Sequence, residues 1–285
     1  MKCSEINIRD PFVVYIDGTF YMYGTRAANF GRNTGGFDVY TSRDLKTWSE
    51  PIPCFDSAEF GLNRSVNWAP EVHCYNGAYY MFATFTRECG WHGTYVLRSD
   101  DPLGPFVPHS ENPLTPTEWE CLDGTLYVSP ENKPYLVFCH EHTQISDGTV
   151  CYLELSEDLT HAVSGATLLF KASESGCADP IVWGGGNHYI TDGPFLYRSK
   201  KDELFMIWSS FIEKKYNVSL VKFAGGRLGT EFEHLEPIIT GDGGHGMIFC
   251  VDDRIYLTFH SPNASGSEHP CFVELVDKGD RLEVK

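Results

Sequence analysis

The sequence predicts an all-β fold, a single five-bladed β-propeller that spans residues 1–285. Three observations lead to this prediction. Aromatic residues are frequent, at 14%, and are interspersed with 27 Gly and 16 Pro, which favours strands separated by tight turns. One unit recurs five times: a polar residue, a short apolar run, a turn and an aromatic-rich strand. No long amphipathic helix is visible, and no linker divides the chain.

Each unit predicts a β-hairpin. The first two contain Asp17-Gly18 and Asn76-Gly77, whose backbones accept the positive φ that a two-residue hairpin turn requires. The five hairpins are expected at 10–23, 69–82, 123–138, 192–208 and 245–259. Further strand-like runs follow them at 37–42, 94–99, 150–156, 218–223 and 271–276. Each blade therefore has at least three predicted strands and room for a fourth.

A polar residue opens every unit. In chain order these residues are Asp10, Glu71, Asp123, Asp192 and His245. The innermost strands of a propeller line its central axis, so we expect these five side chains to meet at one end of the channel. Crowding four carboxyl groups is costly unless the site uses them, and it separates their pKa values. One carboxyl group can then act as an acid while another acts as a base, as glycoside hydrolysis requires.

Composition excludes several classes of partner. The formal net charge of −17 argues against nucleic acid and anionic membranes, which bind basic surfaces. No segment approaches the ~20 consecutive apolar residues of a membrane span. The first residues lack the apolar core of a signal peptide, so we expect a cytoplasmic protein, or a secreted one if a leader was trimmed. Ten scattered cysteines without a C-x-x-C pair predict buried free thiols in a reducing compartment.

Five motifs in order along the chain resemble those of glycoside hydrolase family 43, whose members include arabinofuranosidases, xylosidases and arabinanases. They are Arg9-Asp10-Pro11, Trp68-Ala69-Pro70-Glu71, Asp123, Thr191-Asp192-Gly193-Pro194 and Gly244-His245-Gly246. The resemblance covers essentially the whole chain. It implies an inverting glycosidase in which Asp10 is the general base, Asp192 the general acid, and Asp123 the residue that orients the acid and tunes its pKa.

The resemblance also implies substrates and ligands. Expected substrates are α-L-arabinofuranosides or β-D-xylosides from plant cell-wall hemicellulose or arabinan, as short oligosaccharides. No cofactor is required for the chemistry. His245 resembles an axial histidine that often lies beside a bound cation, so a Ca²⁺ or similar ion held near it through water is expected. The sequence does not indicate an oligomeric state.

Asp192 departs from the family pattern, which has Glu at this position. Asp is one methylene shorter, and a small misplacement of a catalytic group can lower the rate by roughly 10²-fold. Asp192 can be the acid of a site rebuilt around it. Alternatively Glu141, at the end of the second strand of blade three, supplies the proton, or the propeller only binds carbohydrate. Fructan-acting propellers, which retain configuration, are a further alternative.

Side chains around the axis are predicted to bind the sugar. Aromatic faces serve as platforms for sugar rings, and polar groups fix their orientation. Trp68 directly precedes the blade-two motif and is the strongest candidate platform, while Phe30 and Trp91 lie in loops. The remaining predicted substrate-binding residues are Arg26, Glu71 and Glu141.

Overall fold

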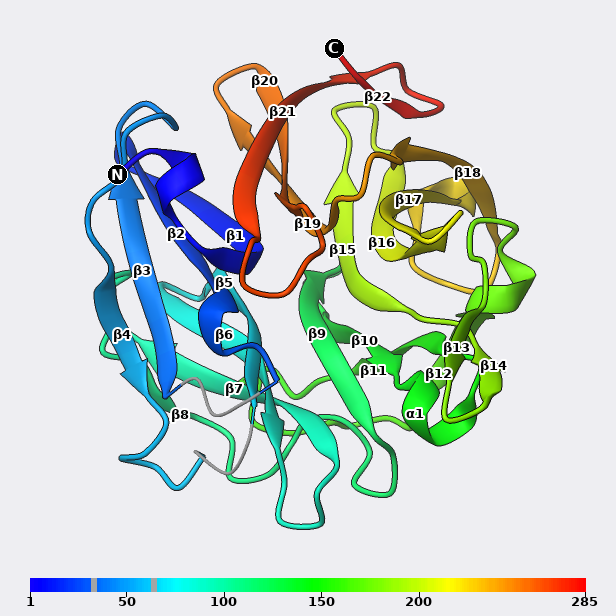
Figure 1. Cartoon of the computed structure of the whole chain (residues 1–285), viewed down its shortest axis with the longest axis horizontal. Coiled ribbons are helices and arrows are strands. Elements are labelled where there is room, and N and C mark those ends of the chain that lie inside the picture. The colour runs from blue at the N-terminus through cyan, green and yellow to red at the C-terminus, as the bar shows by residue number, and fades with distance from the viewer. Residues whose placement is uncertain (32–34, 63–65) are drawn as a thin grey trace.

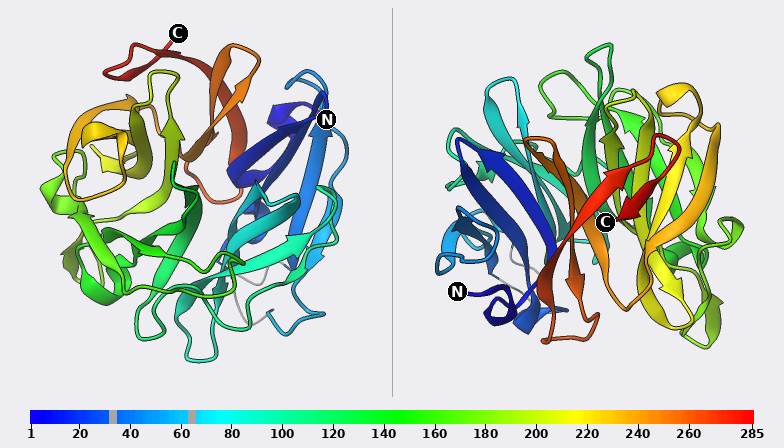
Figure 2. Two further views of the ribbon diagram at one scale, coloured as in Figure 1. Left: turned by 180° about the vertical axis from the view of Figure 1, so that it is seen from behind. Right: turned by 90° about the horizontal axis from the view of Figure 1, so that it is seen from above.

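The computed structural model describes residues 1–31, 35–62 and 66–285. Five four-stranded antiparallel sheets are arranged as blades around a central axis (Figure 1), which confirms the predicted five-bladed propeller. The views from behind and from above show that the first and last blades are neighbours in the ring (Figure 2). The assignment of residues 1–285 to one domain stays a prediction.

The strands of each blade follow one another in sequence, with the innermost strand first. Blade one contains β1 (Ile8–Ile16), β2 (Thr19–Arg26), β3 (Gly36–Ser42) and β4 (Ile52–Asp56). Blade two contains β5 (Asn67–Tyr75), β6 (Ala78–Thr86), β7 (His92–Ser99) and β8 (Val107–Pro108). Blade three contains β9 (Cys121–Val128), β10 (Pro134–His140), β11 (Thr149–Glu154) and β12 (Thr167–Lys171).

Blades four and five repeat this order. Blade four contains β15 (Asp192–Arg198), β16 (Leu204–Ile212), β17 (Lys215–Phe223) and β18 (Phe232–Ile239). Blade five contains β19 (Gly244–Val251), β20 (Arg254–Ser261), β21 (His269–Asp277) and β22 (Leu282–Val284). A separate hairpin, β13 (Ile181–Trp183) and β14 (Gly186–His188), connects blades three and four.

Within residues 1–31, 35–62 and 66–285, helical structure is limited to single turns. These are α1 (His142–Ile145) and the 3₁₀ turns η1 (Cys3–Glu5), η2 (Ala27–Asn29), η3 (Ala172–Glu174) and η4 (Ala224–Gly226). In the part of the chain that the structure describes, none of the helices has the length and apolar character needed to cross a membrane. The ten cysteines are free thiols. The predicted burial holds for only five of them, and it is wrong for Cys74, Cys89 and Cys250, which are exposed.

The predicted hairpin turns are present. Ile16 pairs with Thr19, and both turn residues between them have positive φ, 47° at Asp17 and 77° at Gly18. Asn76-Gly77 has the same geometry, with φ of 47° and 82°. These are the values that a two-residue turn needs to follow the twist of its strands.

A β-bulge interrupts the innermost strand of every blade at the same place. In blade one, Arg9 pairs with Thr25 and Phe12 with Tyr23, so Asp10 and Pro11 together face one residue, Gly24. The first bulge residue of each blade has positive φ; these residues are Asp10 (54°), Ala69 (47°), Asp123 (56°), Gly193 (49°) and His245 (49°). The second is always Pro or Gly, namely Pro11, Pro70, Gly124, Pro194 and Gly246. Proline fits this position because its missing N–H is not needed in an interrupted ladder.

The bulges correct the predicted alignment of the repeat. Asp10, Asp123 and His245 occupy equivalent positions, as expected. Glu71 lies two residues after Ala69, the equivalent residue of its blade, and Asp192 lies one residue before Gly193. The prediction placed all five polar residues at one position because it aligned the units on polarity, whereas the backbone aligns them on the bulge.

The bulges also link neighbouring blades. Each first bulge residue turns its backbone N–H away from its own ladder, and a side chain of the preceding blade accepts it. The accepting atoms are Thr25 Oγ1 for Ala69 (2.7 Å), Thr84 Oγ1 for Asp123 (3.0 Å), Asp123 Oδ2 for Gly193 (3.0 Å), Ser209 Oγ for His245 (2.8 Å) and His260 Nδ1 for Asp10 (3.2 Å). A buried N–H without such a partner would cost about 1–3 kcal/mol.

Side chains, not a shared strand, close the ring between blades five and one. An apolar cluster joins Ile8 of β1 to Met247 of β19. Beside it, Arg9 Nη1 lies 2.7 Å from Glu268 Oε1, and the side chains are 11% and 0% exposed. Asn7 adds a bond from its amide to the Glu268 carbonyl oxygen (2.8 Å). The two ends of the propeller are thus held together by a buried ion pair in an apolar setting.

We expect Glu268→Ala to lower the free energy of unfolding by about 3–5 kcal/mol, because it removes the ion-pair partner of the buried Arg9 guanidinium. Urea denaturation followed by tryptophan fluorescence measures this change. The matched control is Glu274→Ala in the same blade, which breaks an exposed pair with Lys285 (2.7 Å) and should cost about 0–1 kcal/mol. Equal losses for the two variants would contradict a role of the buried pair in ring closure.

Candidate active site

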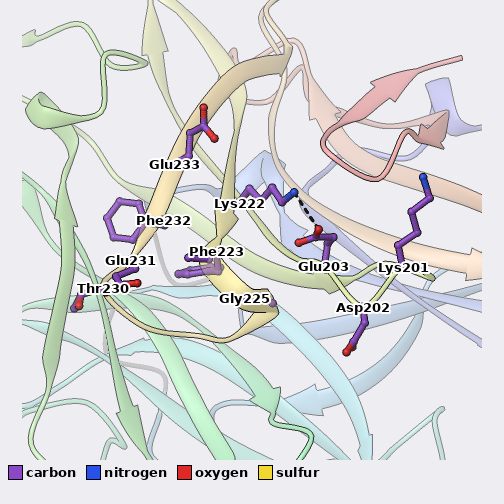
Figure 3. A pocket seen from close by; sticks show the side chains of 12 residues that line it. Lys201, Asp202, Glu203, Lys222, Phe223, Gly225, Thr230, Glu231, Phe232 and Glu233 are labelled. Atoms are coloured by element: carbon purple, nitrogen blue, oxygen red, sulfur yellow. Dashed lines mark ion pairs between the residues drawn. The ribbon is translucent and has the colours of Figure 1, made fainter.

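The bulges surround one mouth of the axial channel, and a cavity of about 540 Å³ opens there. This volume lies within the range of small-ligand sites. All five blades contribute to its wall; the lining residues used below are Arg9, Asp10, Phe30, Trp68, His92, Asp123, Glu141, His142, Trp183, Asp192, Tyr216 and His245. The described residues also form a larger hollow of about 750 Å³ on blade four (Figure 3). There Lys222 pairs with Glu203 (3.2 Å), and no axial residue reaches it, so it is not the candidate site.

His245 joins the carboxyl groups of two other blades. Its Nδ1 lies 3.2 Å from Asp10 Oδ1 and 3.6 Å from Asp123 Oδ2, and all three residues are buried. Burial alone would lower the pKa of His245, but Asp10, Asp123 and Asp192 raise it above its ordinary value. The ring is therefore favoured as an imidazolium between two carboxyl groups, which offsets part of the repulsion predicted for this cluster.

Asp10 is held in the ionised state. Burial opposes ionisation, but the charges of His245 and Arg9 and a hydrogen bond from Thr25 Oγ1 to Asp10 Oδ2 (2.6 Å) bring the pKa of Asp10 below its ordinary value. His260 contributes as a neutral ring. Burial, followed by the charge of Arg9, lowers its pKa to about 3, and its Nδ1 accepts the Asp10 backbone N–H.

The other two aspartates have raised pKa values. Burial raises the pKa of Asp123 to about 7, against the pull of His245, and its Oδ2 accepts the Gly193 N–H (3.0 Å). Burial also raises the pKa of Asp192, although His245 and a hydrogen bond from the Tyr216 hydroxyl to Asp192 Oδ2 (2.8 Å) both lower it. Asp123 thus binds the backbone of the residue that follows Asp192, while its role in orienting the acid stays a prediction.

Glu141 lies at the mouth of the same cavity. It follows β10 and is the N-cap residue of α1, so the chain turns there, and its side chain is 11% exposed. Burial and the nearby charges of Asp192 and Asp123 raise the pKa of Glu141 well above its ordinary value. His142 Nε2 lies 3.3 Å from Glu141 Oε1.

An aromatic wall stands on the side of blades one and two. Phe30 stacks on Trp68 with ring centroids 5.3 Å apart, and the Arg9 guanidinium lies 4.1 Å from the centre of the Phe30 ring. His92 packs on the other side of Trp68, with centroids 4.9 Å apart. Two of the predicted aromatic residues, Trp68 and Phe30, therefore line the cavity.

Three predicted substrate contacts lie elsewhere. Arg26 makes a two-pronged ion pair with Asp38 (2.6 and 2.7 Å) and is absent from the described cavity lining. Trp91 is 38% exposed outside the lining, because its loop projects beyond the cavity. Glu71 is also absent from the lining: it lies deeper along β5 and pairs with His73 Nε2 (3.2 Å). Their positions do not support direct contact with a ligand in this cavity.

Sequence reasoning missed three lining or supporting residues. Tyr216 belongs to β17, the third strand of blade four, and its hydroxyl reaches the axis from there. His260 occupies the strand position opposite Gly244, where blades one, two and four have a hydroxyl residue. Trp183 lies on the connecting hairpin. Only His260 had a detectable signal, because a polar residue recurs near the end of the second strand in four of the five units.

The arrangement of side chains around His245 bears on the cation that is expected near it. His245 Nδ1 already faces two carboxylates, and the favoured imidazolium supplies positive charge at that point. Among the described residues, no group of three or more His, Cys, Asp and Glu side chains is arranged to hold a metal ion. Direct ligation does not fit these residues, and an ion held through water stays a prediction.

Comparisons with known sequences and with solved structures agree on one protein family. The model of the glycosyl hydrolases family 43 matches residues 4–270. The structure is similar to an endo-arabinase from Bacteroides thetaiotaomicron VPI-5482, with a TM-score of 0.89, 34% identity and 98% of each chain covered. It also resembles a thermostable family-43 glycoside hydrolase, with a TM-score of 0.82 over 98% of this chain and 93% of the other, at 22% identity, which bears on the fold alone.

Curated relatives match over shorter stretches. A xylosidase/arabinosidase from Bacteroides ovatus is 26% identical over 137 residues, which is 42% of this chain and 42% of the relative. A non-reducing end alpha-L-arabinofuranosidase from the same species is 26% identical over 137 residues, or 44% of this chain and 24% of the relative. The match thus spans less than half the length of either relative.

We expect Gly193→Ala to destabilise the protein at the wall of the cavity. The residue has a φ of 49°, and an added Cβ would lie 2.7 Å from His245 Cδ2. We expect a loss of about 1–3 kcal/mol in the free energy of unfolding, measured by urea denaturation. Gly165→Ala is the control, since its φ is not positive and nothing lies within 4 Å of the added Cβ. A Gly193→Ala variant as stable as the control would mean that the bulge tolerates a side chain here.

Proposed function

This chain belongs to the glycosyl hydrolases family 43, and from that membership we propose that it is an inverting glycosidase with Asp10 as its general base and Asp192 as its general acid. The observation that carries the proposal is a separation of pKa directions within one cavity: Asp10 is lowered, whereas Asp192 and Glu141 are raised. Relative to ordinary carboxyl groups, this favours the ionised form of Asp10 and the protonated forms of Asp192 and Glu141. Such a pair is what general base and general acid catalysis requires.

Each axial residue has a role in this proposal. Asp10 takes a proton from the water that attacks the anomeric carbon, and the bond from Thr25 fixes the carboxylate for that step. Asp192 protonates the departing glycosidic oxygen. Asp123 holds the backbone beside Asp192 and tunes its proton affinity, while His245 keeps Asp10 ionised.

A second candidate for the proton donor is Glu141. Burial and two neighbouring carboxyl groups raise its pKa well above the ordinary value, whereas the Tyr216 hydroxyl stabilises the ionised form of Asp192. Glu141 is also one methylene longer than Asp192 and lines the cavity mouth. Both residues lie on the side of blades three and four, so either could reach a leaving group bound there.

The proposed substrates are arabino-oligosaccharides with α-L-arabinofuranosyl units, with β-D-xylosides as the second class. Support comes from the 34% identical endo-arabinase and from the xylosidase/arabinosidase and arabinofuranosidase relatives. The cavity agrees with this class, because Trp68 and Phe30 provide an aromatic wall and the carboxyl groups provide hydrogen-bond partners for hydroxyls.

Replacement of the carboxyl groups identifies their roles. We expect Asp10→Asn to lower kcat by roughly 10²–10⁴-fold on every substrate, because activation of water is lost. Replacement of the acid should spare hydrolysis of an aryl glycoside with a good leaving group and abolish hydrolysis of an arabino-oligosaccharide. If Asp192 is the acid, Asp192→Asn shows this split and Glu141→Gln does not.

The exposed Asp202→Asn serves as the control for these variants and should leave both activities unchanged. Proton NMR of the first product should show inversion at the anomeric carbon. A wild-type protein that binds arabino-oligosaccharide in calorimetry without releasing product would contradict the proposal in favour of a binding propeller. Retention of configuration would contradict the inverting mechanism.

Tyr216→Phe tests the acid by pH dependence. The Tyr216 hydroxyl lowers the pKa of Asp192, so its removal raises that pKa. A general acid must be protonated, and activity is lost as pH rises through its pKa. The basic limb of the kcat/KM profile should therefore move to higher pH, while the acidic limb, set by Asp10, stays in place. An unmoved basic limb would indicate that Asp192 is not the acid.

A further inference from the structure

The hairpin β13–β14 presents Trp183 at the edge of the cavity. Trp183 pairs with Gly186, and the two residues between them, Gly184 and Gly185, both have positive φ, 56° and 87°. A two-residue turn of this kind fixes the strand that precedes it. Trp183 is 55% exposed although it lines the cavity, and Val182, its neighbour, is 80% exposed. An exposed tryptophan held in place at a cavity rim contributes little to the core.

The base of this hairpin docks on the loop that follows Glu141. The ring of His188 contacts His142, with their Nδ1 atoms 3.1 Å apart, and His188 Nδ1 also bonds the His142 carbonyl oxygen (2.9 Å). Tyr189 exchanges backbone bonds with this loop: its N–H donates to Ser146 O and its carbonyl accepts from Gly148 (both 2.9 Å). Figure 1 shows β13 and β14 beside α1. The hairpin and the α1 loop therefore form one rigid wall.

Trp183 and His142 form the cavity-facing surface of this wall. Their rings meet edge to face, with centroids 5.8 Å apart and planes at 89°. Burial, together with the neighbouring His188, lowers the pKa of His142 to about 4, so the ring is neutral near pH 7. The wall thus combines an exposed aromatic face with an uncharged hydrogen-bonding ring, a composition suited to a sugar. Across the cavity stands the wall of Trp68 and Phe30.

The two walls lie beside different catalytic groups. Asp10 follows Arg9, which packs on Phe30, so the base lies on the side of the blade-one and blade-two wall. Both proton-donor candidates lie on the other side: Glu141 contacts His142, and Asp192 opens blade four. In an inverting reaction the acid protonates the leaving oxygen while water attacks from the opposite face. The leaving-group sugar must therefore lie toward the hairpin.

We propose that Trp183, supported by His142 and His188, forms the subsite that binds the leaving-group pentose of an arabino- or xylo-oligosaccharide. This inference rests on the proposed glycosidase function and assigns a substrate-contacting residue to it. Because the contact involves only the departing sugar, it stabilises the complex with oligosaccharides and contributes nothing to substrates whose leaving group carries no sugar.

The test compares the activity of the purified protein on two substrates. One is an α-L-arabinotriose with natural linkages; the other is the matching arabinofuranosyl fluoride, whose leaving group is a single atom. We expect Trp183→Ala to lower kcat/KM on the triose by about 10- to 100-fold, mainly through KM, and to leave the fluoride reaction within about twofold of wild type. Trp183→Phe should recover most of the loss, because it restores an aromatic face.

The matched control is Val182→Ala on the same hairpin, which should behave as wild type on both substrates. Thermal unfolding of all three variants should coincide with wild type, since both side chains are largely exposed. Equal loss on triose and fluoride, or unchanged kinetics on the triose, would overturn the subsite. A wild-type protein that hydrolyses neither these substrates nor the corresponding xylosides would instead refute the proposed function, so the two failures are distinguishable.

Discussion

The propeller depends on one backbone constraint, the left-handed bulge residue in each innermost strand. An L-residue in this conformation costs about 1–2 kcal/mol, and its N–H leaves the ladder of its own blade. Each N–H is satisfied by a side chain of the preceding blade, and the five bonds form a closed ring around the axis. The bulges therefore position Asp10, Asp123 and His245 at the axis and also hold each blade against its neighbour. The geometry of the site thus depends on the contacts that close the ring.

The electrostatics of the site follow from which side chains occupy the five bulges. Three positions carry ionisable groups, and His245 lies between the two aspartates. Ala69 and Gly193 occupy the other two and carry no polar group. Asp192 directly precedes Gly193 in the chain, and both proton-donor candidates, Asp192 and Glu141, line the cavity. One imidazolium among several buried carboxyl groups can hold only part of them ionised, which is why Asp10 titrates low while the others titrate high.

The sequence predicted the fold and much of the axis because both repeat. Hairpin turns, aromatic strands and the residues Asp10, Asp123 and His245 recur with a detectable period. The prediction misplaced Glu71 and Asp192 within the repeat because it followed polarity, although Pro or Gly at the second bulge position marked the correct alignment. Tyr216 and Trp183 could not be found this way. One reaches the axis from a third strand, and the other lies on a connection that occurs between only two of the blades, so neither belongs to the repeated pattern.

Blade three shows how the ring and the chemistry are connected. In the other blades the N–H acceptor is a side chain on the second strand: Thr25, Thr84, Ser209 or His260. The equivalent residue in blade three is Cys139, which faces Leu122, and thiols are weak acceptors. Asp123 accepts the Gly193 N–H in its place, and so a bond that is purely structural elsewhere here uses an axial carboxyl group. The geometry of the backbone beside Asp192 is thereby tied to a group whose pKa is about 7. A change in the protonation of Asp123 therefore alters the strength of the bond that it accepts from Gly193, the residue beside the proposed acid.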